Sequence, residues 1–360
     1  MGVFVRHYLL VILFALSLAA CAPSPEQAAT MTVALWTATP TQTSTPTSTT
    51  TPIPTLTASP TPSPTPFGGG RGLLKAYCSK SGETERSNIP FDYDLVSGSL
   101  VAEPPSPLIQ AAKNLPELAD LGAIFPVYSP NEKLAAIADQ GRLFIASADG
   151  RTVREITGLP NMDIAFNSQA WSPASDQIVF SAGSSPSDLE IYILDVASGS
   201  VRRITNDNRQ DAFPVFSPDG SNIAFASQLI GPGSGDSSNG LYVTNVDSPN
   251  DDPSLSYPVV RGIIIDPQWS PDGSRLAMAL ADPQSGAYEI YSVKPDGADL
   301  TPLTDFGLSA SSPLWSPDSA YLSFSLYDFA SRASYVMDAN DSNARPISIQ
   351  GHDCVVGWLP

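Results

Sequence analysis

The stretch Trp269-Ser-Pro-Asp-Gly-Ser-Arg-Leu-Ala-Met-Ala-Leu280 joins an aromatic residue, a tight turn and an apolar run. Ser-Pro-Asp-Gly is typical of a type I turn, because proline sets φ at the second position and Asp and Gly follow it. The apolar run after the turn suits a strand that is buried on both faces. The stretch therefore predicts two antiparallel strands joined by a turn.

The same pattern occurs at four other places in the chain. Each copy begins with an aromatic anchor, and the steps between successive anchors are 43, 45, 53 and 46 residues. Such a period is typical of four-stranded propeller blades and differs from the periods of helical and leucine-rich repeats. The five anchors are Tyr128, Trp171, Phe216, Trp269 and Trp315.

Two further strands are expected in each period, for example at residues 190–195 and 302–304. The succession Trp-Ser-Pro-Asp-Gly, Ile-Ala-Phe, Ile-Tyr and Leu-Thr resembles the WD40-like, or PD40, repeats of TolB-type β-propellers over residues 72–360. The resemblance implies an all-β propeller of four-stranded antiparallel blades. The first two turns depart from the pattern, since Asn131-Glu132 and Ala174-Ser175 replace Asp-Gly.

Fragments at the two ends of the chain predict a sixth blade. Residues 354–360 repeat the anchor strand and carry a sixth anchor, Trp358, while residues 73–78, 91–94 and 99–102 match the second, third and fourth strands. We therefore expect a six-bladed β-propeller over residues 72–360, whose last blade is completed by both termini. All six anchors are expected to pack between blades as core residues.

The sixth blade leads to a prediction about two cysteines. Cys354 lies in its expected first strand and Cys78 in its expected second strand, so the two are expected to be cross-strand neighbours joined by a disulfide. Such a bond would link the two ends of the ring. The alternative is a pair of buried free thiols.

The amino-terminal segment resembles a bacterial lipoprotein signal. Arg6 is followed by an apolar stretch at 8–18 and by Leu18-Ala-Ala-Cys21, with small residues before the cysteine. The resemblance implies a signal peptide over residues 1–20 and a lipidated Cys21 that attaches the protein to a membrane. An uncleaved transmembrane anchor is the alternative. Both interpretations predict an extracytoplasmic protein at the cell membrane or envelope, where disulfides persist.

Residues 21–71 connect this anchor to the propeller. Between residues 37 and 66, 13 Thr and 8 Pro account for most of the 30 positions, a composition that favours an extended, solvated stalk over a folded core. The threonines either carry O-linked sugars or form an unmodified spacer, and the composition is compatible with both.

Charge and histidine content narrow the function classes. The net charge of −18 and the pI near 4.3 exclude nucleic-acid binding and direct adhesion to anionic lipid, because both need a positive surface. Only His7 and His352 are present, too few for a multi-histidine metal site and unfavourable for a Ser-His-Asp triad. No catalytic residue, metal ligand or cofactor is therefore expected. Calcium held by carboxylates remains an alternative without a defined ligand set.

Recognition is expected on one face of the ring. The loops between second and third strands and the connections between blades vary in length, and variable loops on a rigid scaffold usually carry binding. We expect a monomeric, non-enzymatic scaffold that binds an envelope protein or peptide there. The candidate partner-binding residues are Asp207, Asp211, Phe306, Tyr327 and Phe329.

Two other functions remain open at this stage. One is a carbohydrate-active propeller, a lyase or hydrolase that uses carboxylates in the central channel, and the other is a lipoprotein that captures solutes for a transporter. Carboxylates converging with a basic or tyrosine partner would favour catalysis. A broad loop surface with exposed aromatic residues would favour binding.

Overall fold

A computed structural model describes residues 73–80, 89–94, 100–102, 108 and 352–358, and most of residues 126–347. The longest gaps in the last range are residues 230–237 and 248–257. The expected signal peptide, the lipidated Cys21, the stalk and Phe329 lie outside the described residues. Within the described part of the chain, no helix is long and apolar enough to cross a membrane.

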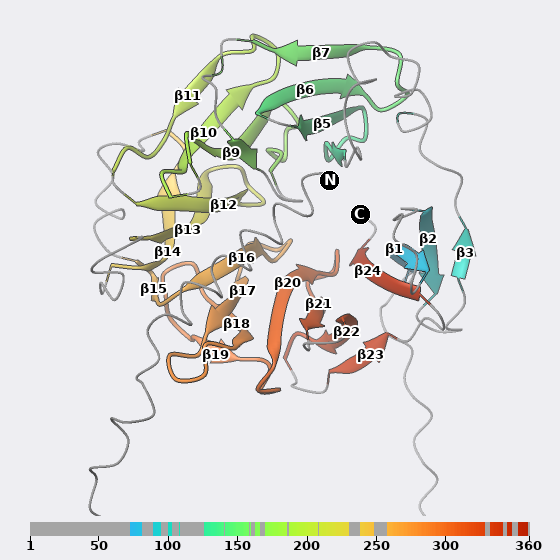
Figure 1. The fold of residues 1–360 in the computed structure, drawn as a ribbon, viewed down its shortest axis with the longest axis vertical. Coiled ribbons are helices and arrows are strands. Elements are labelled where there is room, and N and C mark those ends of the chain that lie inside the picture. The colour runs from blue at the N-terminus through green and yellow to red at the C-terminus, as the bar shows by residue number, and fades with distance from the viewer. Residues whose placement is uncertain are drawn as a thin grey trace, which may run out of the picture.

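The described strands form six four-stranded antiparallel sheets, which follow one another around a common centre (Figure 1). The first three complete sheets in chain order are β4 (Val127–Tyr128), β5 (Leu134–Asp139), β6 (Arg142–Ser147) and β7 (Val153–Ile156); β8 (Asp163–Ala165), β9 (Gln177–Gly183), β10 (Glu190–Asp195) and β11 (Val201–Arg203); and β12 (Gln210–Phe216), β13 (Asn222–Gln228), β14 (Gly240–Asn245) and β15 (Val260–Arg261). The next two are β16 (Ile264–Trp269), β17 (Leu276–Ala281), β18 (Tyr288–Val293) and β19 (Thr301–Pro302); and β20 (Ser309–Trp315), β21 (Tyr321–Tyr327), β22 (Arg332–Asp338) and β23 (Arg345–Ile347). The predicted all-β propeller fold is confirmed.

The remaining sheet joins the two ends of the chain. Its order is β24-β1-β2-β3, with β24 at His352–Trp358, β1 at Leu73–Lys80, β2 at Ile89–Asp94 and β3 at Leu100–Ala102. Strand β24 pairs antiparallel with β1, and Cys78 is opposite Cys354 in this register. Figure 1 shows β24 beside β1 at the side of the ring where blue and red elements meet. The predicted sharing of one sheet by both termini is confirmed.

The anchors pack between sheets, as their size suggests. Trp171, Phe216, Trp269 and Trp315 are buried. The indole Nε1 of Trp171 donates to the carbonyl of Val127 in the preceding sheet at 2.8 Å, and Trp315 forms the equivalent bond to its preceding sheet. Tyr128 is half-buried, and the side chain of Trp358 lies outside the described residues.

All five turns after the anchors have the same backbone conformation. The residue after the Asp position has a positive φ in each, whether it is Gly or not, and its amide donates to the carbonyl of the turn serine at 2.8–2.9 Å. Three of the five carry a side chain in this left-handed region, which glycine adopts more readily. The turns of the first two blades therefore keep the geometry of Asp-Gly despite their different residues. The five residues are Glu132, Ser175, Gly220, Gly273 and Ser319.

Candidate functional site

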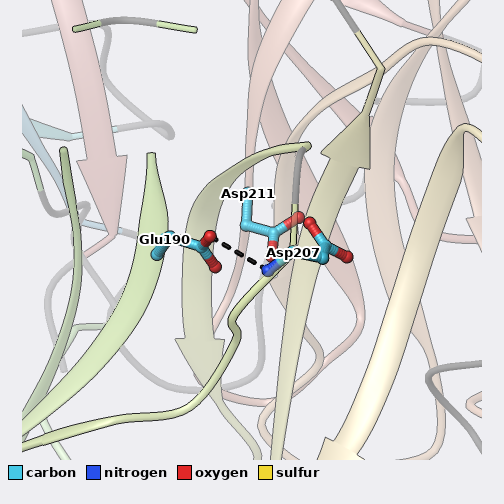
Figure 2. A group of neighbouring side chains, drawn as sticks. All are labelled: Glu190, Asp207 and Asp211. Atoms are coloured by element: carbon cyan, nitrogen blue, oxygen red, sulfur yellow. Dashed lines mark hydrogen bonds between the residues drawn. The ribbon is translucent and has the colours of Figure 1, made fainter. Parts of the chain in front are cut away.

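A polar pocket of about 450 Å³ lies at the junction between the β8–β11 and β12–β15 sheets. It is formed where the connection after β11 meets the start of β12 and the end of β13, on the long-loop face of the ring. Carboxylate oxygens of Glu190, Asp207 and Asp211 lie within 4.8 Å of one another there (Figure 2). The lining residues are Arg203, Ile204, Thr205, Asn206, Asp207, Arg209, Asp211, Phe225, Ser227 and Tyr242.

Glu190, the first residue of β10, binds the connection that follows β11. Its Oε1 accepts a hydrogen bond from the Asp207 amide at 3.1 Å and pairs with the Arg203 guanidinium at 2.6 Å. Its Oε2 is buried and has no hydrogen-bond partner among the described residues. One oxygen of this carboxylate therefore holds the loop, while the other remains available.

Asp211 lies in β12, where it pairs with Ser227 of β13. Only 1% of the residue is exposed, and neither carboxyl oxygen has a hydrogen bond of normal geometry to any described residue. Burial raises the pKa of Asp211 to about 7, and the nearby hydroxyls of Ser227 and Thr205 offset only part of this effect. A buried carboxyl group without such bonds destabilises a fold, so its presence needs a reason outside the fold.

Arg209 and Tyr242 also line the pocket, and the Arg209 Nε lies 3.8 Å from Asp207 Oδ2. The Arg209 Nη1 donates to the Ser238 carbonyl at 2.7 Å and to the Tyr242 hydroxyl at 2.9 Å, and the guanidinium lies 5.6 Å from the tyrosine ring centroid. The Tyr242 hydroxyl in turn donates to the Ser238 carbonyl at 2.5 Å, and burial raises the pKa of Tyr242. The Arg209 Nη1 and the Tyr242 hydroxyl thus donate their hydrogen bonds to groups of the protein. The unpartnered carboxylate oxygens of the pocket are acceptors and suit a cation or a donor group.

The junction between the β16–β19 and β20–β23 sheets provides an internal comparison. Glu289 occupies the place of Glu190: its Oε1 accepts from the amides of Phe306 and Gly307 at 2.8 Å, and its Oε2 accepts from the Thr304 hydroxyl at 2.5 Å. A glutamate at this position therefore serves the fold by holding the connection between sheets.

Asp211 and Ser227 have apolar counterparts in the next two sheets. Counted from the anchors, their paired positions correspond to Ile264–Leu280 in one following sheet and Ala310–Leu326 in the next. Those two sheets have an apolar pair at these positions, whereas the β12–β15 sheet has the carboxyl group of Asp211 and the hydroxyl group of Ser227.

Phe306 takes the place of Asp207 at the comparison junction, because its amide makes the same bond to the glutamate. Its ring centroid lies 6.1 Å from that of Phe324 and 5.5 Å from that of Tyr335. An aromatic ring thus packs at one junction where the other has a polar pocket. The comparison junction therefore shows that the repeat can be built without the polar pocket.

The structure brings two of the predicted partner-binding residues together, Asp207 and Asp211. Phe306 is 38% exposed and packs on the neighbouring β20–β23 sheet. Tyr327 is the last residue of β21 in that sheet and lies opposite Ser309 of β20. The sequence analysis missed Glu190, Arg209 and Tyr242. Position-by-position alignment of the repeats distinguishes Asp211 from the apolar Ile264 and Ala310 of the next two sheets, whereas the sheet shared by both termini has Asp353, opposite Ser79, at this position.

The comparisons with known proteins agree with this fold. No family model matches the chain. The Tol-Pal system protein TolB of Francisella tularensis subsp. mediasiatica is 35% identical over 112 residues, which are 30% of this chain and 24% of that protein. The chain thus spans about a quarter of the length of the curated relatives it matches.

Two solved structures share the fold at lower identity. TolB from Acinetobacter baumannii has a TM-score of 0.57 at 17% identity and covers 81% of this chain and 68% of its own. An oligogalacturonate lyase in complex with manganese has a TM-score of 0.50 at 16% identity and covers 71% and 69% of the two chains. The fold is a TolB-like β-propeller, and enzymes and TolB proteins both have it.

Proposed function

We propose that this TolB-like β-propeller is an extracytoplasmic, lipid-anchored scaffold that binds an envelope protein or peptide through its long-loop face. The leader over residues 1–20, which precedes Cys21, and the Thr/Pro-rich stalk support the membrane attachment. The TolB relatives support an envelope role, because their name places them in the Tol-Pal system.

One observation carries the binding role. The long-loop face contains a pocket of about 450 Å³ with the buried Asp211, at a junction whose counterpart is packed with apolar side chains. This volume lies in the range of ligand-binding pockets. Because the repeat provides an apolar alternative that builds the same fold, the polar version is best explained by recognition.

The experiment fills the pocket with the side chains found at the equivalent positions of the comparison junction. The triple variant Asp207→Phe, Asp211→Ala and Ser227→Leu introduces the side chains that Phe306, Ala310 and Leu326 provide at the other junction. Photo-crosslinking on cells, followed by mass spectrometry, identifies the envelope components that contact the full-length protein. We expect a component that crosslinks to the wild type and is lost from the filled variant.

The matched control is Asp296→Asn, which removes an exposed carboxylate from a turn on the opposite face. This control should keep the crosslink. Equal crosslinking of the filled variant and the wild type would contradict recognition at this pocket. A Cys21→Ala variant tests the anchor separately, because loss of the lipid should move the protein from the membrane fraction to the soluble fraction.

A second candidate function, hydrolysis or elimination on a glycan, is favoured by one observation. Asp211 has a pKa of about 7 and lies with two other carboxylates near Arg209 and Tyr242, as acid–base chemistry would require. Against it, Arg209 and Tyr242 bind the protein's own backbone, and the net charge of −18 disfavours anionic glycans. Release of reducing ends from a neutral glycan panel, abolished by Asp211→Asn, would establish this function instead.

A further inference from the structure

We propose that Glu190, Asp207 and Asp211 form a binding site for a divalent cation, and that the cation is calcium. The three residues come from β10, from the connection after β11 and from β12, so two neighbouring sheets contribute ligands. One oxygen from each residue lies within 4.8 Å of the other two, so an ion at their centre would lie about 2.8 Å or less from each, close to the usual calcium–oxygen range of about 2.3–2.6 Å. One ion can therefore contact all three carboxylates.

The buried oxygens point to a ligand independently of this clustering. Glu190 Oε2 and both carboxyl oxygens of Asp211 are buried and lack a hydrogen-bond partner among the described residues. Buried carboxylates normally pair with cations or accept several hydrogen bonds. A bound metal ion would supply the missing partner to all three oxygens at once.

The comparison junction shows that the fold itself does not need these groups. Ala310 and Leu326 replace Asp211 and Ser227 there, and Phe306 replaces Asp207. Glu289 keeps the structural role of Glu190 but has both oxygens bound to the connection. Of these two junctions, the polar one combines a glutamate oxygen without a described hydrogen-bond partner with two further carboxylates.

The donor set favours calcium over other divalent metals. The carboxylates and the nearby hydroxyls of Thr205 and Ser227 are all oxygen donors, and no histidine or cysteine lines the described pocket. Hard cations prefer oxygen, and calcium tolerates irregular coordination that magnesium does not. Because Arg203 and Arg209 lie beside two of the carboxylates, we expect a weak site, with a dissociation constant on the order of 10⁻⁴ to 10⁻³ M.

Terbium luminescence tests the site directly. Tb³⁺ takes the place of calcium at oxygen sites, and Tyr242 lines the pocket, so excitation of tyrosine should sensitise the bound ion. The experiment uses the full-length protein in detergent, freed of metal by a chelator. We expect saturable luminescence that calcium displaces, and calcium binding by calorimetry with the same stoichiometry of one ion.

Four variants separate the site from general acidity. Asp211→Ala and Asp207→Asn should weaken calcium binding at least tenfold, while Tyr242→Phe should reduce the luminescence but leave the calorimetric affinity within about twofold. Glu155→Gln, which removes an exposed carboxylate from the outer strand β7, should change neither. Thermal unfolding establishes that each variant is folded, and Asp211→Ala copies the residue of the comparison junction.

Two results would overturn the proposal. One is unchanged calcium affinity in Asp211→Ala and Asp207→Asn. The other is stabilisation by n-butylammonium and not by calcium, lost in Asp211→Ala, which would make the pocket a site for a partner's amine. These titrations contain no partner protein, so they test calcium binding alone. Calcium binding can be absent while the crosslink to a partner is present, and a crosslink can be absent while calcium binds.

Discussion

Cys78 and Cys354 lie directly opposite each other in the antiparallel register of β1 and β24, although nearly the whole ring separates them along the chain. We propose that they form a disulfide, since directly opposed strand residues have backbones close enough for this bond. Without reducing agent, these two cysteines should resist alkylation, and a proteolytic digest should contain one peptide pair that reduction separates. Full alkylation without reduction would show free thiols instead.

The same bond should contribute to stability. It closes a very long loop, for which chain-entropy arguments give about 5 kcal/mol as an upper limit. Replacing both cysteines by serine should therefore lower the free energy of unfolding by up to about 5 kcal/mol, measured by urea denaturation. Reduction of the wild type should produce a similar decrease, whereas the double variant should not respond to reduction.

Asp211→Ala should stabilise the metal-free protein. The wild type buries the Asp211 carboxyl group without a hydrogen bond of normal geometry to any described residue, and Ala310 shows that the fold accepts alanine at the equivalent position. At pH 8 in the presence of a chelator, we expect the free energy of unfolding to rise by about 1–3 kcal/mol. A decrease would mean that Asp211 holds the junction together.

Glu289→Ala should have the opposite effect. Its carboxylate accepts hydrogen bonds from the Thr304 hydroxyl and from the amides of Phe306 and Gly307. Removing it leaves these donors unpaired, which should lower the free energy of unfolding by roughly 3 kcal/mol. Glu155→Ala, on an exposed strand position, serves as the comparison and should change it by less than about 0.5 kcal/mol.

The left-handed turn positions predict a reciprocal pair of effects. Glu132 is exposed and has a φ of 57°, while Gly273 has a φ of 71° at the equivalent position. Glu132→Gly should stabilise the protein by up to about 1 kcal/mol, and Gly273→Ala should destabilise it by about 1 kcal/mol. Chemical denaturation of both variants under identical conditions measures these changes in the free energy of unfolding. Changes of the same sign would contradict the prediction.

Acid should remove part of the stability that the turns provide. The Ser217 hydroxyl donates to Asp219, and the Ser270 hydroxyl donates to Asp272, each at 2.6 Å. These hydrogen bonds are the largest cause that lowers the pKa of each carboxyl below 3.8. A lowered pKa in the folded state means that the contribution is present above pH 3.8 and disappears as the pH falls further. Because both groups are largely exposed, the contribution of each stays below about 1 kcal/mol.

Asp219→Asn and Asp272→Asn together should therefore lower the unfolding free energy at pH 7. The difference from the wild type should shrink as the pH falls through the lowered pKa of each wild-type carboxyl and the carboxyls become protonated. Urea denaturation at a series of pH values measures both quantities. A difference that stays constant down to pH 2 would show that the effect of the substitutions is not electrostatic.

Periodicity explains why the blades and their closure were predictable. Each blade repeats an anchor and a turn, and β24 with β1 to β3 carries the same signals, so local chemistry was enough to place these strands. The residues of the pocket were harder to predict from the repeat pattern. Asp207 and Asp211 were selected because they lie near a variable connection, but Glu190 and Tyr242 come from regular strands and meet them only through the packing of neighbouring sheets.

The pairing of β24 with β1 also orders events during synthesis. A ribosome makes β1 before the five intervening sheets and β24 after them, so the edge of β1 that pairs with β24 has no partner until the rest of the ring exists. An unpaired edge is a template for association with other chains. A nascent molecule that lacks β24 is therefore expected to associate with other chains more readily than one in which β24 has paired with β1.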